Sequence, residues 1–467
     1  MDILRSFVSP ILGVLHKMQL TIQLPILRVA HGPLNWRLIS IGLTLASSLF
    51  ETLILLRQLP NYSKPAPPSS LADHFPLETY TKSQAYGRSK ALFTLTKTVW
   101  GMFEGTLILY SDFYAWAWSA SAGVLAYFGY GGEREIAQSI IFAGILALLA
   151  TIPSLPWDYY YTFVLEQHHG FNKTTHLTFW LDFVKSLAIG ALLGVPFLAA
   201  FLGIIKHFGQ DFVTYLMGFL LVFQLVMVVL FPLVIQPLFN KLTPLEEGSS
   251  LRKRIEGLAG RLKFPLKHLY QIDGSKRSSH SNAYFYGLPW SKHIVIFDTL
   301  ITQSTEEEVE AVLAHELGHW SLSHPTKLLL LNQVHIFLLL SSFPPFLSSR
   351  TFLPSFNIPL YPTSAPILPT FLLFQLFLQP LEHAMQFAMH AVTRAYEYQA
   401  DAFAVAMGGE MKQRLGDALV KLHVKNLSTL HVDWLYSAYH YSHPTLPERL
   451  RAMDKLEAKK SKEGKEL

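Results

Sequence analysis

The chain has 467 residues, of which 50% are apolar and only 15% are charged, and its mean hydropathy is +0.27. A soluble domain usually carries about 25% charged residues, so this composition excludes an ordinary soluble protein and predicts a membrane protein. The net charge of +5 does not indicate a nucleic-acid partner, because the lysines and arginines are spread over loops and the C-terminal tail, as in basic loops at a membrane surface.

Charge-free apolar runs recur along the chain, and several reach the roughly 20 residues that a spanning helix needs. In chain order they are 38–56 (interrupted by Glu51), 113–132, 136–157, 186–205, 212–240, 328–349 and 351–381. Prolines crowd the first part of the last run, so its helix is expected to begin near Ile367, which leaves 350–366 as a loop. The sequence therefore predicts about seven transmembrane helices after an N-terminal extension over 1–35.

The distribution of basic residues predicts the orientation of these helices. Segment 57–98 carries six lysines and arginines, whereas the 350–366 loop carries one. By the positive-inside rule, 57–98, the insert 241–327 and the C-terminal tail are expected in the cytosol. The basic residues of the N-terminal stretch oppose this orientation.

The long polar insert 241–327 lacks apolar spans and instead has the residue patterns of a folded domain. It begins with a basic helical pattern, and three runs rich in β-branched and aromatic residues then predict strands over 268–273, 281–287 and 292–298. Thr305 and Glu308 next form the capping-box pattern that starts a helix. The order predicts a small sheet followed by a helix.

That helix carries the pattern H-E-x-x-H at His315, Glu316 and His319. Positions i and i+4 share a helix face, so both imidazoles can reach one tetrahedral Zn²⁺, while Glu316 is offset and can contact a metal-bound water. Zinc lowers the pKa of such a water towards about 7. The alternative is that the motif occurs by chance. Its position on a capped helix that follows a sheet argues against that alternative.

A catalytic zinc usually has three protein ligands, and the chain contains no cysteine that could be the third. The best source is 394–406, where Glu397 and Asp401 stand at i and i+4 on a helical pattern that continues the last span. Glu397 can complete a His-His-Glu site, and Asp401 can accept a hydrogen bond from a ligand histidine. The alternative for this pair is an ordinary solvated helix face. The other candidate histidines are His324, His335, His383 and His390.

Several longer motifs resemble one family of membrane enzymes, the type I CaaX prenyl proteases, which are integral-membrane zinc endopeptidases. The resemblance rests on GSKRSSHSNAYFYG, EAVLAHELGHW, RAYEYQADAFA, YSHPTLPERL and LPWDYYYTFVLEQHHGFN, and it runs from about Trp36 to Met453. It implies that His315, His319 and Glu397 bind one Zn²⁺ per chain.

The same resemblance implies roles for further residues. Glu316 matches the general base, His443 a residue that stabilises the oxyanion, and Arg449 an arginine that supports the site. Asn282 and Ala283 match an edge strand that holds the substrate backbone, and an edge strand beside an active-site helix can bind an extended peptide by strand addition. From the residues alone, His443 would be interpreted as a surface or cap residue and Arg449 as a solvated charge.

The expected fold is a mainly α polytopic membrane protein with about seven transmembrane helices and a zincin-like metallopeptidase domain that contains a small β-sheet. The expected parts are an extension (1–35), transmembrane helices 1–5 (36–240), a cytosolic insert with the sheet and the H-E-x-x-H helix (241–327), transmembrane helices 6–7 (328–393), and the rest of the metallopeptidase domain with a basic tail (394–467).

The resemblance implies removal of the aaX tripeptide from prenylated (farnesylated) CaaX proteins, with a second upstream cleavage as a further reaction. It also implies a monomer in the endoplasmic reticulum membrane or the inner nuclear membrane, in contact with membrane lipid. Two alternatives stay open. A quality-control zinc peptidase for membrane proteins would use the same metal residues. A non-enzymatic zinc transporter or scaffold would place its ligands within the spans and would not need Glu316.

Ionisable residues in or at the ends of the spans, such as Glu51 and Asp112, are costly in lipid, at about 2.5–3.5 kcal/mol each at a helix centre. Two interpretations stay open for them. They line a wet intramembrane chamber that admits a lipid-modified substrate, or they form hydrogen bonds between helices.

Overall fold

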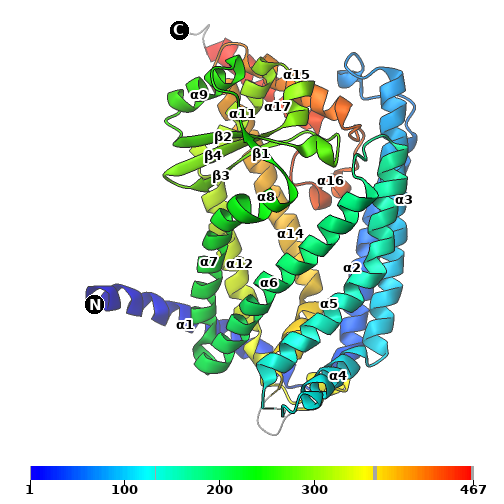
Figure 1. Cartoon of the computed structure of the whole chain (residues 1–467), viewed down its shortest axis with the longest axis vertical. Coiled ribbons are helices and arrows are strands. Elements are labelled where there is room, and N and C mark those ends of the chain that lie inside the picture. The colour runs from blue at the N-terminus through cyan, green and yellow to red at the C-terminus, as the bar shows by residue number, and fades with distance from the viewer. Residues whose placement is uncertain (1, 132, 361–364, 464–467) are drawn as a thin grey trace.

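Long apolar helices make up most of the chain, and a domain that contains a small sheet lies against one end of them (Figure 1). This computed structural model describes residues 2–131, 133–360 and 365–463. Part of the predicted 350–366 loop and the end of the predicted basic tail lie outside these ranges. Each part has its own hydrophobic core, one among the long helices and one between the sheet and its covering helices. The predicted mainly α architecture is confirmed.

The long helices run roughly along the length of the molecule in Figure 1. They are α2 (Trp36–Gln58), α3 (Leu77–Tyr110), α5 (Glu135–Tyr160), α6 (His176–Phe208), α7 (Phe212–Leu230), α12 (His324–Ser342) and α14 (Ile367–Ala406). Helix α14 begins at Ile367 as predicted, and its 40 residues continue from the bundle into the second domain. Shorter or peripheral helices are α1 (Asp2–Ala30), α4 (Phe113–Tyr127), α8 (Gln236–Phe239) and α13 (Pro344–Leu347).

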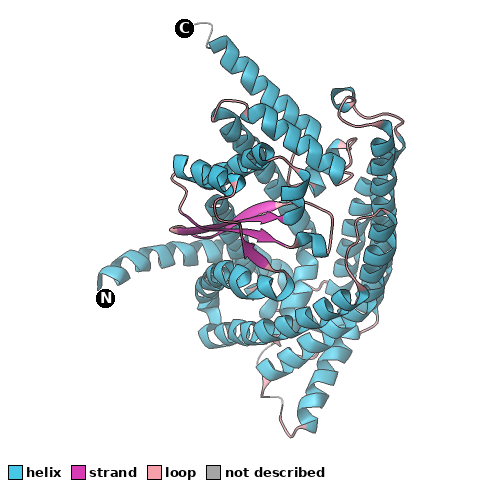
Figure 2. Cartoon of the chain, turned by 45° about the horizontal axis from the view of Figure 1, so that its top comes forward, coloured by secondary structure: helices cyan, strands magenta, loops and turns pink. Residues whose placement is uncertain are grey.

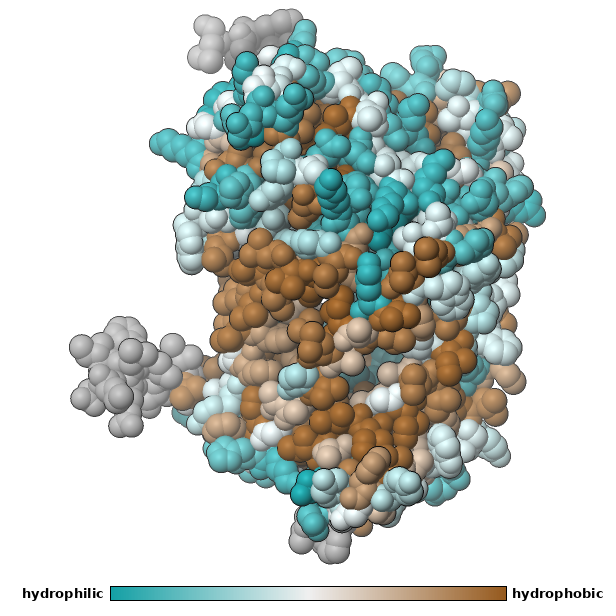
Figure 3. Space-filling model, viewed as in Figure 1, coloured by the Kyte–Doolittle hydropathy of each residue, from teal (hydrophilic) through white to brown (hydrophobic). Residues whose placement is uncertain are grey.

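The described residues confirm a multi-pass membrane protein. Among them, four stretches are long and apolar enough to cross a membrane: Trp36–Ser63, Glu135–Glu166, His176–Phe239 and His324–Leu347. The third contains both α6 and α7. Figure 3 shows a broad apolar band over these helices on the face in view, with hydrophilic side chains above and below it.

The second predicted span differs from the structure. Run 113–132 forms only the 15-residue helix α4, which at 1.5 Å per residue is about 22 Å long, shorter than a bilayer core of about 30 Å. Segment 57–98, expected as a cytosolic connection, instead contains most of the 34-residue helix α3. Its first turns are polar, so no charge-free run marks it, and its packing against α2 supports it as a helix.

The sheet has four strands in the order β1-β2-β4-β3. They are β1 (Leu242–Pro244), β2 (Leu266–Ile272), β3 (Ala283–Leu288) and β4 (Ser291–Phe297). Strand β2 is parallel to β4, whereas β1 and β3 are antiparallel to their neighbours, which leaves β3 at one edge. The three predicted strands therefore agree with the structure to within about two residues, and β1 was not predicted.

Helices cover this sheet and connect it to the bundle (Figure 2). They are α9 (Ser250–Arg261), α10 (Asp298–Gln303), α11 (Glu306–Ser321), α15 (Met411–Lys425), α16 (Trp434–His440) and α17 (Leu446–Glu463). Helix α11 begins with the predicted capping box between Thr305 and Glu308. It packs against α14, α15, α9 and β3, and most of its residues from Glu308 onward are buried. In its first turn, Glu306 and Glu307 pair with Arg254 of α9.

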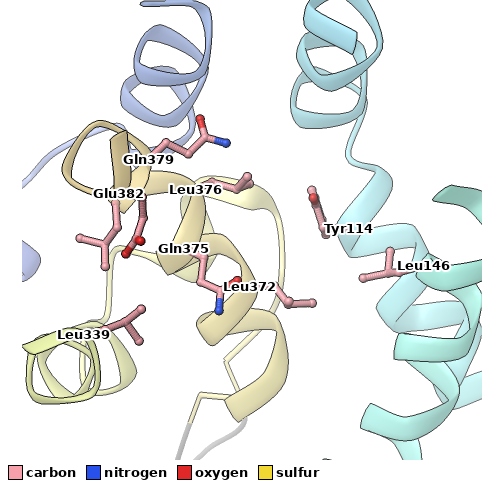
Figure 4. Close-up of a pocket in the computed structure, with 9 residues that line it drawn as sticks. Tyr114, Leu146, Leu339, Leu372, Gln375, Leu376, Gln379 and Glu382 are labelled. Carbon is pink, nitrogen blue, oxygen red and sulfur yellow. The ribbon is translucent and has the colours of Figure 1, made fainter. Parts of the chain in front are cut away.

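A partly polar pocket of about 540 Å³ lies among the bundle helices. Figure 4 shows Gln375, Gln379 and Glu382 of α14 on one side of it and Tyr114 of α4 and Leu146 of α5 on the other. Two amides and the Glu382 carboxylate, which pairs with His335 at 3.0 Å, give this pocket one polar wall.

Glu51 and Asp112 do not line this pocket. Glu51 accepts a hydrogen bond from Tyr439 at 3.3 Å, and Asp112 accepts one from Asn357 at 3.0 Å and pairs with Arg37. Between the two interpretations of these carboxylates, the structure therefore supports hydrogen bonds between segments.

Candidate metal centre

Two helices bring three side chains with metal-ligating atoms together. His315 and His319 come from consecutive turns of α11, and Glu397 comes from the part of α14 that lies in the second domain. The two Nε2 atoms are 3.2 Å apart. The Glu397 carboxylate oxygens lie 3.4 Å from His315 Nε2 and 3.3 Å from His319 Nε2.

The Nδ1 atom of each of these two histidines has a hydrogen-bond partner, and that hydrogen bond fixes which ring nitrogen carries the proton. His315 Nδ1–H donates to Asp401 Oδ1 at 2.9 Å. His319 Nδ1–H donates to His324 Nδ1 at 3.0 Å, and His324 Nε2–H donates in turn to Gln399 Oε1 at 3.0 Å. Both ligand histidines therefore present a bare Nε2 lone pair to the same point.

These observations fit a bound metal ion. Two facing nitrogen lone pairs at 3.2 Å repel each other unless a cation lies between them. Ligand atoms about 2.0–2.1 Å from a tetrahedral zinc are about 3.3–3.4 Å from one another, close to the distances found. Glu397 Oε2 is buried without a hydrogen-bond donor among the described residues. Burial alone would raise the pKa of Glu397, but the two imidazoles outweigh it and the pKa is lowered.

Arg449 lies behind this set, at the start of α17. Its guanidinium donates to both carboxylate oxygens of Asp401, at 2.8 Å from Nε and 2.6 Å from Nη2. Both side chains are almost fully buried, with exposed fractions of 8% for Arg449 and 1% for Asp401. A guanidinium matches a carboxylate in two parallel bonds, so Arg449 locks the group that orients His315.

Glu316 follows the first ligand on α11 and has a different environment from Glu397. Its carboxylate forms no hydrogen bond or ion pair with a described residue. Burial raises the pKa of Glu316 above its ordinary value. A carboxylate that is partly desolvated, unpaired and next to a metal ligand is free to exchange a proton with a substrate or a water.

The predicted oxyanion and substrate residues lie on two further segments. His443 Nε2 is 3.2 Å from Glu397 Oε1, and its side chain is 62% exposed. Strand β3 starts at Ala283, is one of the two edge strands of the sheet and packs against α11. Asn282 is exposed, and its side chain accepts a hydrogen bond from the backbone N–H of Ala283 at 2.8 Å. A free strand edge and an exposed imidazole thus flank the metal ligands.

The remaining candidate histidines divide into one inside the site and three outside it. His324 is 1% exposed and stacks on Tyr396 with ring centroids 4.1 Å apart. His335 pairs with Glu382, whereas His383 and His390 both bind Tyr439. The sequence interpretation missed Tyr396 and Gln399, although both lie in the same stretch as Glu397 and could have been noticed there.

Replacing His324 by alanine should weaken metal binding by about 10–100-fold, because His319 would lose the acceptor that fixes its tautomer. The measurement is the dissociation constant for Zn²⁺ in competition with a chelating dye. His74→Ala is the matched control, since the exposed His74 imidazole forms no hydrogen bond with a described residue. An unchanged dissociation constant for His324→Ala would show that His319 does not depend on this contact.

Comparison with known proteins agrees with this geometry. Residues 58–241 match the family "CAAX prenyl protease N-terminal, five membrane helices", and residues 245–457 match peptidase family M48. The chain is 42% identical to CAAX prenyl protease 1 of Saccharomyces cerevisiae, over 92% of this chain and 98% of that protein. It is 35% identical to the CAAX prenyl protease 1 homologue of Homo sapiens, over 87% and 92%.

A solved structure is similar throughout its length. The crystal structure of S. mikatae Ste24p superposes with a TM-score of 0.85 at 42% identity and covers 91% of this chain and all of that one. The fold, the paired metal-binding histidines and glutamate, and the sequence relatives lead to the same conclusion. This chain belongs to peptidase family M48 and, within it, to the CAAX prenyl protease 1 family of membrane metallopeptidases.

Proposed function

We propose that this metallopeptidase cuts prenylated CaaX proteins after the prenylated cysteine and releases the aaX tripeptide, with a second upstream cleavage as a further reaction. The observation that carries the proposal is the position of the His-His-Glu cluster, at the junction between membrane helices and a domain with a free strand edge. A prenylated C-terminus has a tail that prefers lipid and a carboxylate end that prefers water. A site at this junction can accept both ends.

We propose that His315, His319 and Glu397 hold one zinc ion per chain, the metal that this combination of ligands prefers. When bound, zinc would supply Lewis-acid polarisation of the scissile carbonyl and activation of water. Glu316 takes a proton from the attacking water and passes it to the leaving nitrogen. Removal of that proton makes the water a better nucleophile, and its return prevents the amine from leaving as an anion.

Three other groups position the substrate and its transition state in this proposal. The His443 imidazole donates a hydrogen bond to the carbonyl oxygen as negative charge develops there. Strand β3, from Ala283 with the preceding Asn282, binds the peptide backbone as an added strand. Asp401 and Arg449 do not touch the substrate, and they hold His315 in place.

The cellular setting is part of the proposal. The metallopeptidase domain, 241–327 with the C-terminal part of the chain, faces the cytosol, where basic segments are favoured. The membrane is that of the endoplasmic reticulum or the inner nuclear membrane, and the chain acts as a monomer on prenylated (farnesylated) proteins. This orientation gives the site access to prenylated cytosolic proteins.

Cleavage should require both the metal and the prenyl group. Purified protein in detergent is given two CaaX peptides that differ only in farnesylation, each with and without a zinc chelator, and the products are identified by mass spectrometry. We expect loss of the last three residues, much faster on the farnesylated peptide and abolished by the chelator. Activity should return when Zn²⁺ is added back.

Other outcomes of this assay would favour the alternatives. Equal cleavage of both peptides, or cutting at scattered internal bonds, would indicate a quality-control peptidase for membrane proteins. A transporter or scaffold would bind zinc without cleaving either peptide. Against that alternative, the ligands come from α11 and the end of α14 rather than from the middle of the bundle.

A further inference from the structure

A second cavity, which none of the metal ligands line, lies where the sheet meets the ends of the membrane helices. Its volume is about 540 Å³. Lysines from three separate segments line it: Lys185 on α6, Lys241 just before β1, and Lys276 in the turn after β2. The aromatic rings of Tyr270, Tyr286 and Phe239 complete its walls. Of these residues, the proposed cleavage mechanism involves only Tyr286, through the backbone of β3.

The cavity lies at the edge of the apolar band. Lys185 immediately precedes the charge-free run 186–205, and Lys241 immediately follows the run 212–240. Helices α6 and α7 are packed neighbours of opposite direction, so these two ends lie on the same side of the band. Figure 1 shows α8 between the membrane helices and the sheet, at the height where the band of Figure 3 gives way to hydrophilic side chains.

The positive charge of this cavity is largely uncompensated. Lys241 and Lys276 form no ion pair with any residue that the structure describes. The Lys185 ammonium donates to the backbone carbonyl of Leu238 at 2.9 Å and is 4.0 Å from Asp182, which is already bound by Arg277 at 2.8 Å.

The single carboxylate among the lining residues is engaged as well. Asp273 Oδ1 accepts hydrogen bonds from the backbone N–H of Lys241 at 2.7 Å and from Asn240 at 3.2 Å. An anion would therefore find the ammonium groups of Lys241 and Lys276 unpaired among the described residues, with that of Lys185 beside them.

Apolar side chains continue from the cavity into the band. Leu233 and Leu238, which line it, are 57% and 49% exposed, and Val184, next to Lys185, is 60% exposed. Tyrosine rings at the level of lipid head groups and lysines just outside a span are the groups that anchor proteins to a membrane surface. A ligand that suits both regions has an anionic head and acyl chains.

We propose that this cavity binds the phosphorylated head group of an anionic membrane lipid, with its acyl chains along the exposed Val184, Leu233 and Leu238. The three ammonium groups meet the phosphate oxygens, and Tyr270 and Tyr286 contact the head group. Since Tyr286 belongs to β3, the bound lipid lies beside this edge strand of the domain and holds that domain at the bilayer surface. Inositol and serine phospholipids have the required charge.

The test is native mass spectrometry of the full-length protein in a neutral detergent, titrated separately with dioleoylphosphatidylserine, dioleoylphosphatidylcholine and inorganic phosphate. We expect phosphatidylserine to bind more tightly than phosphatidylcholine. The variant Lys241→Gln/Lys276→Gln should lose about tenfold or more of the phosphatidylserine affinity while its phosphatidylcholine affinity stays unchanged.

A matched variant, Lys253→Gln/Lys455→Gln, removes two exposed lysines that line no part of this cavity and form no ion pair with a described residue. It should bind phosphatidylserine like the unmodified protein. An equal loss in both variants, or no preference for phosphatidylserine, would overturn the site. Complete displacement of the lipid by millimolar inorganic phosphate would assign the cavity to a soluble anion instead. Bound zinc, measured on the same samples, reports that each variant is folded.

Discussion

Replacing Glu316 by glutamine should lower the rate of peptide cleavage by about 10²–10⁴-fold, the range usually lost with a general acid–base group. The amide has nearly the same shape as the carboxylate but cannot accept the proton of the attacking water. Because Glu316 is not among the converging ligand atoms, zinc binding should be unchanged. The measurement is kcat on a farnesylated peptide together with the metal content of the same preparation.

Glu307→Gln is the matched control for this change. Glu307 lies on the same helix, two turns before the ligands, and its carboxylate pairs with Arg254 on α9 at the surface. We expect that variant to cleave at nearly the normal rate. If Glu316→Gln also cleaved normally with its zinc in place, the proton acceptor would have to be sought elsewhere in the site.

Arg449→Ala should destabilise the protein by about 3–5 kcal/mol, because it leaves the Asp401 carboxylate buried without its cationic partner. The Asp401 side chain is 1% exposed, so water cannot replace the two lost hydrogen bonds. Misorientation of His315 should in addition weaken zinc binding by about 10–100-fold. Thermal unfolding in detergent and zinc competition measure the two effects.

Two further variants distinguish the contribution of burial to this loss of stability from the contribution of the positive charge. Arg57 makes the same two-bond contact with Asp433, at 3.2 and 2.9 Å, but its side chain is 48% exposed. Arg57→Ala should therefore cost less than about 1 kcal/mol. Arg449→Lys keeps the charge but loses the planar fork, so we expect a stability between those of Arg449→Ala and the unmodified protein. Equal, small losses for Arg57→Ala and Arg449→Ala would contradict the structural role of Arg449.

The geometry also explains how a metal that works on water can lie beside a bilayer. Helix α12 begins at His324, whose ring orients the ligand His319, and then continues directly into the membrane. Helix α14 runs in the opposite direction, from the polar pocket among the bundle helices to Glu397. The membrane helix α12 and the bundle helix α14 thus connect the site to the bundle, and the three ligands lie in the sheet-containing domain at their ends.

Most of the helices and strands could be predicted from local residue patterns in the sequence. Runs of apolar residues indicated helices α2, α5, α6, α7, α12 and α14, and runs of β-branched and aromatic residues indicated β2, β3 and β4. The i, i+4 spacing placed His315 and His319 on one face of α11, and Glu397 and Asp401 on one face of α14. Each of these inferences needs only the geometry of a single helix or strand, which local sequence controls.

Tertiary structure alone decided the rest. Helix α3 carries polar residues over its first turns, so only its packing against α2 reveals it. The contact between His324 and His319 needs a turn in which Ser323 adopts a left-handed conformation, with φ of 58°, and local sequence does not specify that turn. Arg449 meets His315 from 134 positions away. Such contacts depend on how helices pack, because their free energy comes from burial that no single segment can provide.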